Sequence, residues 1–155
     1  MSVASEDRVS HTFARIHIHL IFSTKERQKL IPKEMQPKLW SYMAGICHNQ
    51  GIEPIAINGT DNHAHVLFHL PPIMALAKAV NLIKANSSRW MREHKRRFAW
   101  QDGYGAFSVS ESNTQAVVDY IRDQEKHHRR RSYEQEFLTL LKKHRFKFDP
   151  RYIFG

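Results

Sequence analysis

Alternating apolar and polar side chains run through two segments of this chain and restrict the folds open to it. From Phe13 to Ser23 the apolar residues fall on every second position, namely Ile16, Ile18, Leu20 and Phe22. The segment from His63 to Leu70 repeats the pattern with Ala64, Val66, Phe68 and Leu70. Successive residues of a strand point to opposite faces, so we expect two strands that each bury one face.

Elsewhere the apolar spacing changes to that of amphipathic helices. Helices are predicted over 32–49 and 73–94, a second strand over 52–58, a turn over 59–62 and a fourth strand over 106–110. The order β-α-β-β-α-β is typical of the ferredoxin-like split β-α-β arrangement, an α+β fold with an antiparallel sheet and helices on one face. This topology hosts many functions and by itself selects none.

Two C-terminal helices should follow this unit. The first carries Tyr120 and Gln124, and Ser112 with Gln115 forms a capping box in front of it. The second spans about 134–144. We therefore predict one domain over residues 1–155, with its core at about 11–145, because a chain of 155 residues can close one core but not two ordinary ones.

The charge of the chain points to a polyanionic partner. Twenty-four Lys and Arg residues against fifteen Asp and Glu residues give a net charge of +9, which favours phosphate contacts with nucleic acid. Cys47 is the only cysteine, so no internal disulfide can form. No segment has the ~20 consecutive apolar residues that a membrane span needs, so we expect a cytoplasmic protein with no membrane partner.

Two histidine pairs have the spacing of metal ligands on a strand. His63 and His65 are two apart and therefore present two imidazoles on one face. His17 and His19 have the same spacing, so periodicity alone does not separate the pairs. Position favours the first pair, because it follows the turn 59–62 and opens its strand, whereas the second pair lies in mid-strand.

Tyr120 and Gln124 are four apart and should project from one face of their helix. A phenol can attack phosphorus, and an amide oxygen can bind a hard cation. An ordinary amphipathic stripe with Tyr120 as a core aromatic explains the same spacing. The basic run that follows, which includes Arg129, Arg130 and Arg131, favours the catalytic interpretation because it could hold a phosphate backbone.

Taken together, these motifs resemble those of the HUH single-tyrosine transposases, compact enzymes of the smallest bacterial insertion sequences that move DNA as single strands. The resemblance spans about residues 11–144. Its parts are Phe22-Ser23-Thr24-Lys25, Asp61-Asn62-His63-Ala64-His65, Lys84-Ala85-Asn86-Ser87-Ser88-Arg89-Trp90, the segment 100–108 and the segment from Tyr120 to His128. The family has a bulky apolar residue between its histidines, where this chain has Ala64.

The resemblance implies a metal-dependent endonuclease and strand transferase. His63, His65 and Gln124 would hold Mg²⁺ or Mn²⁺, and Tyr120 would attack the scissile phosphate to form a 5′-phosphotyrosine. Two imidazoles favour a transition metal, whereas the family implies Mg²⁺ or Mn²⁺, so we expect Mn²⁺ to bind more tightly and Mg²⁺ to be usable. His127 or His128 is a candidate base.

The resemblance also implies the partners. The substrate would be single-stranded DNA with hairpins, and the enzyme would be a homodimer with composite active sites, in which the tyrosine helix of one copy completes the site of the other. The residues predicted to contact DNA are basic: Lys84, Arg89, Arg92, Arg96, Arg97, Arg129, Arg130 and Arg131. Trp90 and Trp100 could stack on bases, although packing in the core or at a dimer interface explains them as well.

Two alternatives remain at this stage. A non-catalytic ferredoxin-like module that binds RNA or single strands would explain the charge and the Gly- and aromatic-rich segment 103–109. A zinc hydrolase built on His63 and His65 would need a further ligand, for which His69 and Asp61 are candidates.

Overall fold

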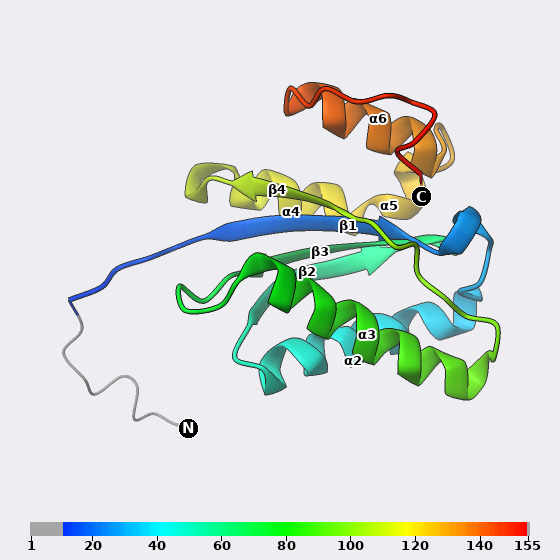
Figure 1. The fold of residues 1–155 in the computed structure, drawn as a ribbon, viewed down its shortest axis with the longest axis horizontal. Coiled ribbons are helices and arrows are strands. Elements are labelled where there is room, and N and C mark those ends of the chain that lie inside the picture. The colour runs from blue at the N-terminus through cyan, green and yellow to red at the C-terminus, as the bar shows by residue number, and fades with distance from the viewer. Residues whose placement is uncertain (1–10, 155) are drawn as a thin grey trace.

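The computed structural model describes residues 11–154 and is built on a four-stranded antiparallel sheet (Figure 1). The strands are β1 (His17–Ser23), β2 (Glu53–Gly59), β3 (His63–His69) and β4 (Gly105–Val109). Their order across the sheet is β2-β3-β1-β4, with β3 and β1 in the centre. This order confirms the predicted ferredoxin-like α+β arrangement.

Helices cover both faces of the sheet (Figure 1). The long helices α2 (Gln36–Asn49) and α3 (Leu76–His94) lie on one face, and the C-terminal helices α4 (Thr114–Arg122), α5 (Gln124–His127) and α6 (Tyr133–Lys143) lie on the other. Within residues 11–154, no helix is long and apolar enough to span a membrane.

The period of two in the central strands divides the core between the two faces. Ile18, Leu20 and Phe22 of β1 pack with the apolar residues of α2 and α3 in the larger cluster. Ile21 faces the other way and packs with Phe107 and with Tyr133, Phe137 and Leu141 of the C-terminal helix α6. The helix α6 is therefore held against the sheet by its own small core.

Several predicted boundaries shift by a few residues. The strand β1 begins at His17 rather than at Phe13, because its pairing with β3 and β4 ends at His17↔His69 and His17↔Val109. The helix α3 begins at Leu76 rather than at Ile73. Both differences leave the order of elements unchanged.

The predicted capping box of Ser112 and Gln115 is wrong. A short 3₁₀ turn, Glu111–Asn113, precedes α4, so Ser112 does not occupy the N-cap position. Its hydroxyl lies 3.3 Å from that of Ser110, and Gln115 donates to Asp119 at 3.0 Å. A capping box does form one helix later, between Ser132 and Gln135 at the start of α6.

Candidate metal centre

The strand β3 brings His63 and His65 to the face of the sheet that carries the C-terminal helices. Both side chains are fully buried. In the register of the sheet His65 lies opposite Ile21 and His63 opposite Ser23, so both histidines lie toward the C-terminal end of β1. The spacing of two therefore does place two imidazoles side by side, with ring centroids 5.2 Å apart.

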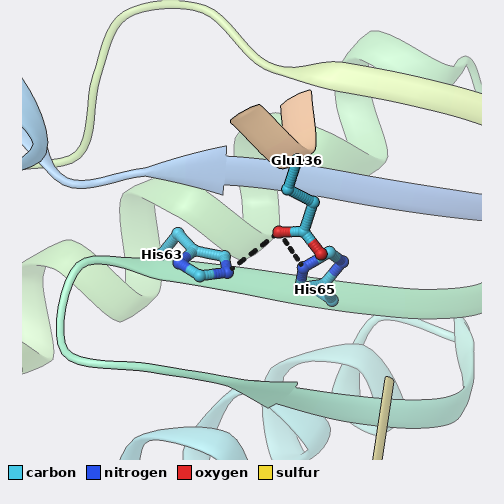
Figure 2. A group of neighbouring side chains, drawn as sticks. All are labelled: His63, His65 and Glu136. Carbon is cyan, nitrogen blue, oxygen red and sulfur yellow. Dashed lines mark hydrogen bonds and ion pairs between the residues drawn. The ribbon is translucent and has the colours of Figure 1, made fainter. Parts of the chain in front are cut away.

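Glu136 of α6 completes this pair with a buried carboxylate (Figure 2). Its Oε1 lies 3.3 Å from His63 Nε2 and 3.2 Å from His65 Nε2. Burial opposes ionisation of this carboxyl, but the neighbouring imidazoles of His65, His128 and His63 outweigh burial and hold the pKa of Glu136 well below its usual range. The group His63, His65 and Glu136 can therefore offer two nitrogens and one charged oxygen to a metal ion.

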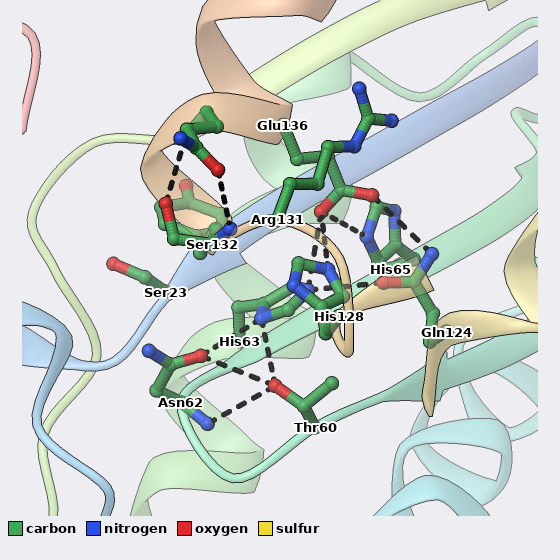
Figure 3. A network of polar contacts seen from close by, with 12 residues as sticks. Ser23, Thr60, Asn62, His63, His65, Gln124, His128, Arg131, Ser132 and Glu136 are labelled. Atoms are coloured by element: carbon green, nitrogen blue, oxygen red, sulfur yellow. Dashed lines mark hydrogen bonds and ion pairs between the residues drawn. The ribbon is translucent and has the colours of Figure 1, made fainter. Parts of the chain in front are cut away.

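Gln124 of α5 reaches the same place (Figure 3), and so does Tyr120 of α4. The helix breaks at Asp123, yet Gln124 still points its Oε1 to within 3.1 Å of His63 Nε2. The Tyr120 hydroxyl donates a hydrogen bond to Glu136 Oε2. The structure thus brings together the predicted nucleophile and all three predicted metal ligands within one chain.

Hydrogen bonds around His63 show which of its nitrogens carries the proton. Asn62 donates its Nδ2 to the Arg27 carbonyl at 3.3 Å, which turns its Oδ1 toward His63 Nδ1 at 2.9 Å. An amide oxygen only accepts, so Nδ1 carries the proton and Nε2 presents a lone pair. That lone pair faces oxygens of Gln124 and Glu136. His63 Nε2, Gln124 Oε1 and Glu136 Oε1 are therefore three acceptor atoms that face one another. Either a cation between them or protonation of the His63 ring would relieve their repulsion.

Protonation of His63 is the weaker of these two solutions. Burial lowers the pKa of His63 to about 4, and the hydrogen bond that a charged ring would donate to Glu136 acts in the opposite direction. The ring is therefore neutral near pH 7. A cation between His63, Gln124 and Glu136 would satisfy all three lone pairs, and the residues present fit a bound metal.

The separations of the donor atoms also fit a shared metal. Ligand atoms that bind one ion at ~2.1 Å lie about 3.0 Å apart in an octahedral shell and about 3.4 Å apart in a tetrahedral one. The observed separations are 3.1 Å for His63 to Gln124, 3.3 Å for His63 to Glu136 and 3.2 Å for His65 to Glu136. The two sets of distances agree.

Tyr120 is only partly buried, and polar groups surround its hydroxyl. Arg131 donates to the phenolic oxygen at 3.2 Å, and the ring of His127 stacks on the Tyr120 ring at 4.6 Å. Burial and the charge of Glu136 raise the pKa of Tyr120, while Arg131 opposes this shift. The sequence suggested His127 or His128 as the base, but the group that accepts the Tyr120 hydrogen bond is Glu136.

The basic residues predicted to contact DNA fall into two groups. Arg129, Arg130 and Arg131 follow α5 and, with Lys29 and Lys33, line an open groove beside the metal centre. The other group belongs to α3 and the loop after it, on the opposite side of the sheet, and its arginines are exposed: Arg89, Arg92, Arg96 and Arg97.

Lys84 is engaged with the backbone rather than left free. Its Nζ donates to the carbonyls of Gln101 at 2.7 Å and Gly103 at 2.8 Å. Burial lowers the pKa of Lys84 to about 8. Trp100 is 7% exposed and donates to Ser87, so it belongs to the core.

Of the network, Glu136 was missed at the sequence level and two histidines were given other roles, with His128 as a candidate base and His19 in the pair that was set aside. Glu136 had a visible signal, since a glutamate stands beside Phe137 and three residues after Tyr133 on the buried stripe of its helix. His128 continues the spacing of four from Tyr120 and Gln124. His19 lies on β1 opposite β3, and its Nε2 is 2.8 Å from His65 Nδ1.

The fold and this constellation define a ferredoxin-like protein with a buried histidine pair that could hold a metal and with an adjacent tyrosine. A family model described as "Transposase IS200 like" matches residues 12–124. The chain belongs to this family of transposases, whose activity is DNA transposition.

Two relatives agree with this assignment. The chain is 24% identical over 130 residues to the transposase for insertion sequence element IS200 of Salmonella typhimurium, with 79% of this chain and 85% of that protein covered. It is 25% identical over 118 residues to the ISDra2 transposase TnpA of Deinococcus radiodurans, with 71% and 84% covered.

Two solved structures share the fold. The first is a putative transposase from Deinococcus radiodurans R1, with a TM-score of 0.62, 22% identity, and coverage of 76% of this chain and 97% of that one. The second is a REP-associated tyrosine transposase bound to a REP hairpin, with a TM-score of 0.58, 15% identity, and coverage of 79% and 74%.

Proposed function

We propose that this transposase cuts and rejoins single-stranded DNA, with Tyr120 as the nucleophile and a divalent metal held by His63, His65, Gln124 and Glu136. One observation carries the proposal. A single carboxylate, Glu136, accepts a hydrogen bond from the Tyr120 hydroxyl with one oxygen and lies 3.2 Å from His65 Nε2 with the other. The nucleophile and the metal ligands are therefore neighbours.

A bound Mg²⁺ or Mn²⁺ would polarise the scissile phosphate and offset its charge. The residues of the chain do the rest. Glu136 is the nearest acceptor for the phenolic proton, and Arg131 at 3.2 Å stabilises the phenolate. Stacking by His127 restricts the rotation of the Tyr120 ring, so the oxygen stays directed at the centre.

Cleavage joins the Tyr120 oxygen to phosphorus and breaks the bond from phosphorus to the 3′ oxygen. The products are a 5′-phosphotyrosine and a free 3′-hydroxyl. Attack by the 3′-hydroxyl of another strand reverses this step and releases Tyr120. The covalent intermediate conserves the energy of the phosphodiester bond, so strand transfer needs no outside energy source.

The groove lined by Lys29, Lys33 and Arg129–Arg131 is suited to the backbone of the strand being cut, because it is basic and His128 of the network also lines it. Hairpins near the ends of the element are the substrate features we propose. The similarity to a transposase bound to a REP hairpin supports this choice. Arg89, Arg92, Arg96 and Arg97 on the other side of the sheet would contact the stem, and Lys84 would need to release its carbonyl partners to do so.

The decisive test is a covalent adduct. A labelled single-stranded hairpin is incubated with the protein and Mn²⁺ and then run on a denaturing gel. Wild type should form a protein–DNA adduct, Tyr120→Phe should form none, and Tyr133→Phe should form it normally. Tyr133 is a matched control, because its ring lies 4.9 Å from that of His63 but its hydroxyl donates to Gln101.

Other outcomes identify the alternatives. Binding of RNA without any adduct would favour the non-catalytic module, and metal-dependent hydrolysis that survives Tyr120→Phe would favour the zinc hydrolase. For the latter, His69 is an unsuitable third ligand because its Nδ1 accepts a hydrogen bond from the Ile16 amide at 3.2 Å, at the far end of β3.

A homodimer with composite sites is a further part of the proposal, and mixing two inactive variants tests it. If the tyrosine helix acts on the partner's centre, Tyr120→Phe and His63→Ala copies should together restore adduct formation. If each chain uses its own tyrosine, as the contacts within this chain allow, the mixture should remain inactive.

A further inference from the structure

Part of the metal centre comes from a segment outside the family match. The match ends at Gln124, whereas His128 and Glu136 lie beyond it. The two side chains nevertheless converge on the centre (Figure 3). Glu136 Oε1 lies 3.0 Å from His128 Nε2, and this is the oxygen that faces His63 and His65.

We propose that His128 is a third imidazole ligand, which joins His63, His65, Gln124 and Glu136 in a centre that selects Mn²⁺ over Mg²⁺. The inference rests on the proposed metal site and deepens it. Imidazole nitrogen suits transition metals, whereas Mg²⁺ prefers oxygen ligands and retains water. Each added imidazole therefore shifts the preference of the site away from Mg²⁺.

The backbone places His128 where such a ligand is needed. Its amide donates to the Gln124 carbonyl at 3.0 Å, so the helical path continues for one turn beyond Gln124. Residues four apart share a helix face. Tyr120, Gln124 and His128 therefore form one stripe that carries the nucleophile, an amide oxygen and an imidazole toward β3.

The side chain of His128 lies against the group His63, His65 and Glu136 and is largely sheltered from solvent. Its side chain is 12% exposed, and its ring centroid is 4.4 Å from that of His63. The 3.0 Å separation from Glu136 Oε1 is that of neighbouring ligands in an octahedral shell, which is about 3.0 Å for ~2.1 Å bonds. A purely structural role, in which His128 only donates to Glu136, explains the same contact and is the outcome the experiment must separate.

Metal binding by the full chain provides the test. Protein stripped with a chelator is titrated with Mn²⁺, and the free ion is followed by electron paramagnetic resonance. Competition with Mg²⁺ gives the ratio of the two affinities. Loss of an outer-shell partner typically weakens metal binding ~10–100-fold. His128→Ala should weaken Mn²⁺ binding by at least this factor, and it should weaken Mg²⁺ binding less than Mn²⁺ binding. His48→Ala, at an exposed position of α2, should change neither affinity.

Nitrogen modulation in the pulsed resonance signal adds a readout that a structural role would not change. Bound Mn²⁺ should show three coordinated imidazoles in wild type and two in His128→Ala. Glu136→Gln should also weaken Mn²⁺ binding, whereas Glu134→Gln, on the same helix but paired with Arg27, should not. Circular dichroism confirms folding, and His128→Asn replaces His128→Ala if the latter does not fold.

The outcomes separate this inference from the proposed function. Wild-type Mn²⁺ affinity in His128→Ala, with the same two coordinated imidazoles in both proteins, together with loss of binding in His63→Ala, would overturn the third ligand and leave the proposed site intact. Wild-type affinity in both variants would overturn the metal site itself. Adduct formation by Tyr120→Phe would instead contradict the proposed nucleophile, whatever the metal result.

Discussion

Replacement of His19 by phenylalanine should weaken metal binding although His19 is not a ligand. His19 lies on β1, is 4% exposed, and stacks on His65 with ring centroids 5.0 Å apart. Its Nε2 is 2.8 Å from His65 Nδ1. Burial lowers the pKa of His19 to about 3, so the ring is neutral and can accept the His65 Nδ1 proton. That hydrogen bond keeps the lone pair of His65 Nε2 directed at the metal.

The size of the effect follows from this contact. Phenylalanine keeps the ring and most of its volume but removes the acceptor, which leaves the His65 N–H buried and unpaired. An unpaired buried donor costs about 1–3 kcal/mol. Loss of an outer-shell partner typically costs ~10–100-fold in metal affinity, which corresponds to about 1.4–2.7 kcal/mol. The two ranges overlap, so we expect a loss of about that size in Mn²⁺ affinity.

His17→Phe is the matched control. His17 is on the same strand and face, is 7% exposed, and contacts Thr114 rather than the metal centre. Both variants are titrated with Mn²⁺, and urea unfolding of the metal-free proteins checks that each is folded. Wild-type affinity in His19→Phe, or an equal loss in His17→Phe, would refute the reasoning.

Three further predictions concern stability and metal linkage. Phe137→Ala should lower the free energy of unfolding in urea by about 3–5 kcal/mol, because it removes a ring from the small core that holds α6 to the sheet. It should also weaken Mn²⁺ binding. A loss below about 1 kcal/mol would contradict this role. Gly59→Ala should be strongly destabilising in the same assay, because a Cβ there would overlap the His63 carbonyl. Gly45→Ala meets no neighbouring atoms and should stabilise α2 by about 0.5–1 kcal/mol. Equal effects of the two substitutions would argue against a close approach at Gly59. Mn²⁺ at 100 times its dissociation constant should stabilise the fold by about 2.7 kcal/mol, and a chelator should reverse the shift in thermal unfolding; an unchanged melting temperature would indicate no binding to the folded state.

The parts of the site that the sequence predicted are those set by local geometry. Two residues share a strand face because strand side chains alternate, so His63 and His65 had to lie together once the segment was recognised as a strand. Tyr120 and Gln124 share a helix face for the same kind of reason, even though the helix breaks at Asp123. The alternating pattern also predicted the order of strands, because the ferredoxin-like arrangement follows from the sequence of elements.

The histidine pair on β1 shows where local pattern stops being informative. The mid-strand position of this pair led us to place both histidines outside the centre. This is correct for His17 but wrong for His19, which contacts His65. The register between β1 and β3 decides this, because it places His19 opposite Leu67, two pairs along the ladder from His65 and on the same face. Register depends on the packing of the whole sheet, so spacing within β1 could not reveal the contact.

The position of Glu136 depends on packing over a still longer range, and the family match, which ends at Gln124, does not include this residue. It lies 71 residues from His65 along the chain, and α6 presents it only because Phe137 and Leu141 pack on Ile21 and Phe107. Ionised Glu136 inside the protein must be compensated, since burying an isolated charge is costly. The imidazoles do this in part, and a cation would complete the compensation by bringing the lone pairs of His63 and Gln124 into favourable contact. The small core under α6 therefore has a chemical consequence: by fixing one carboxylate between the tyrosine and the histidines, it couples the folding of the C-terminal segment to the assembly of the metal centre.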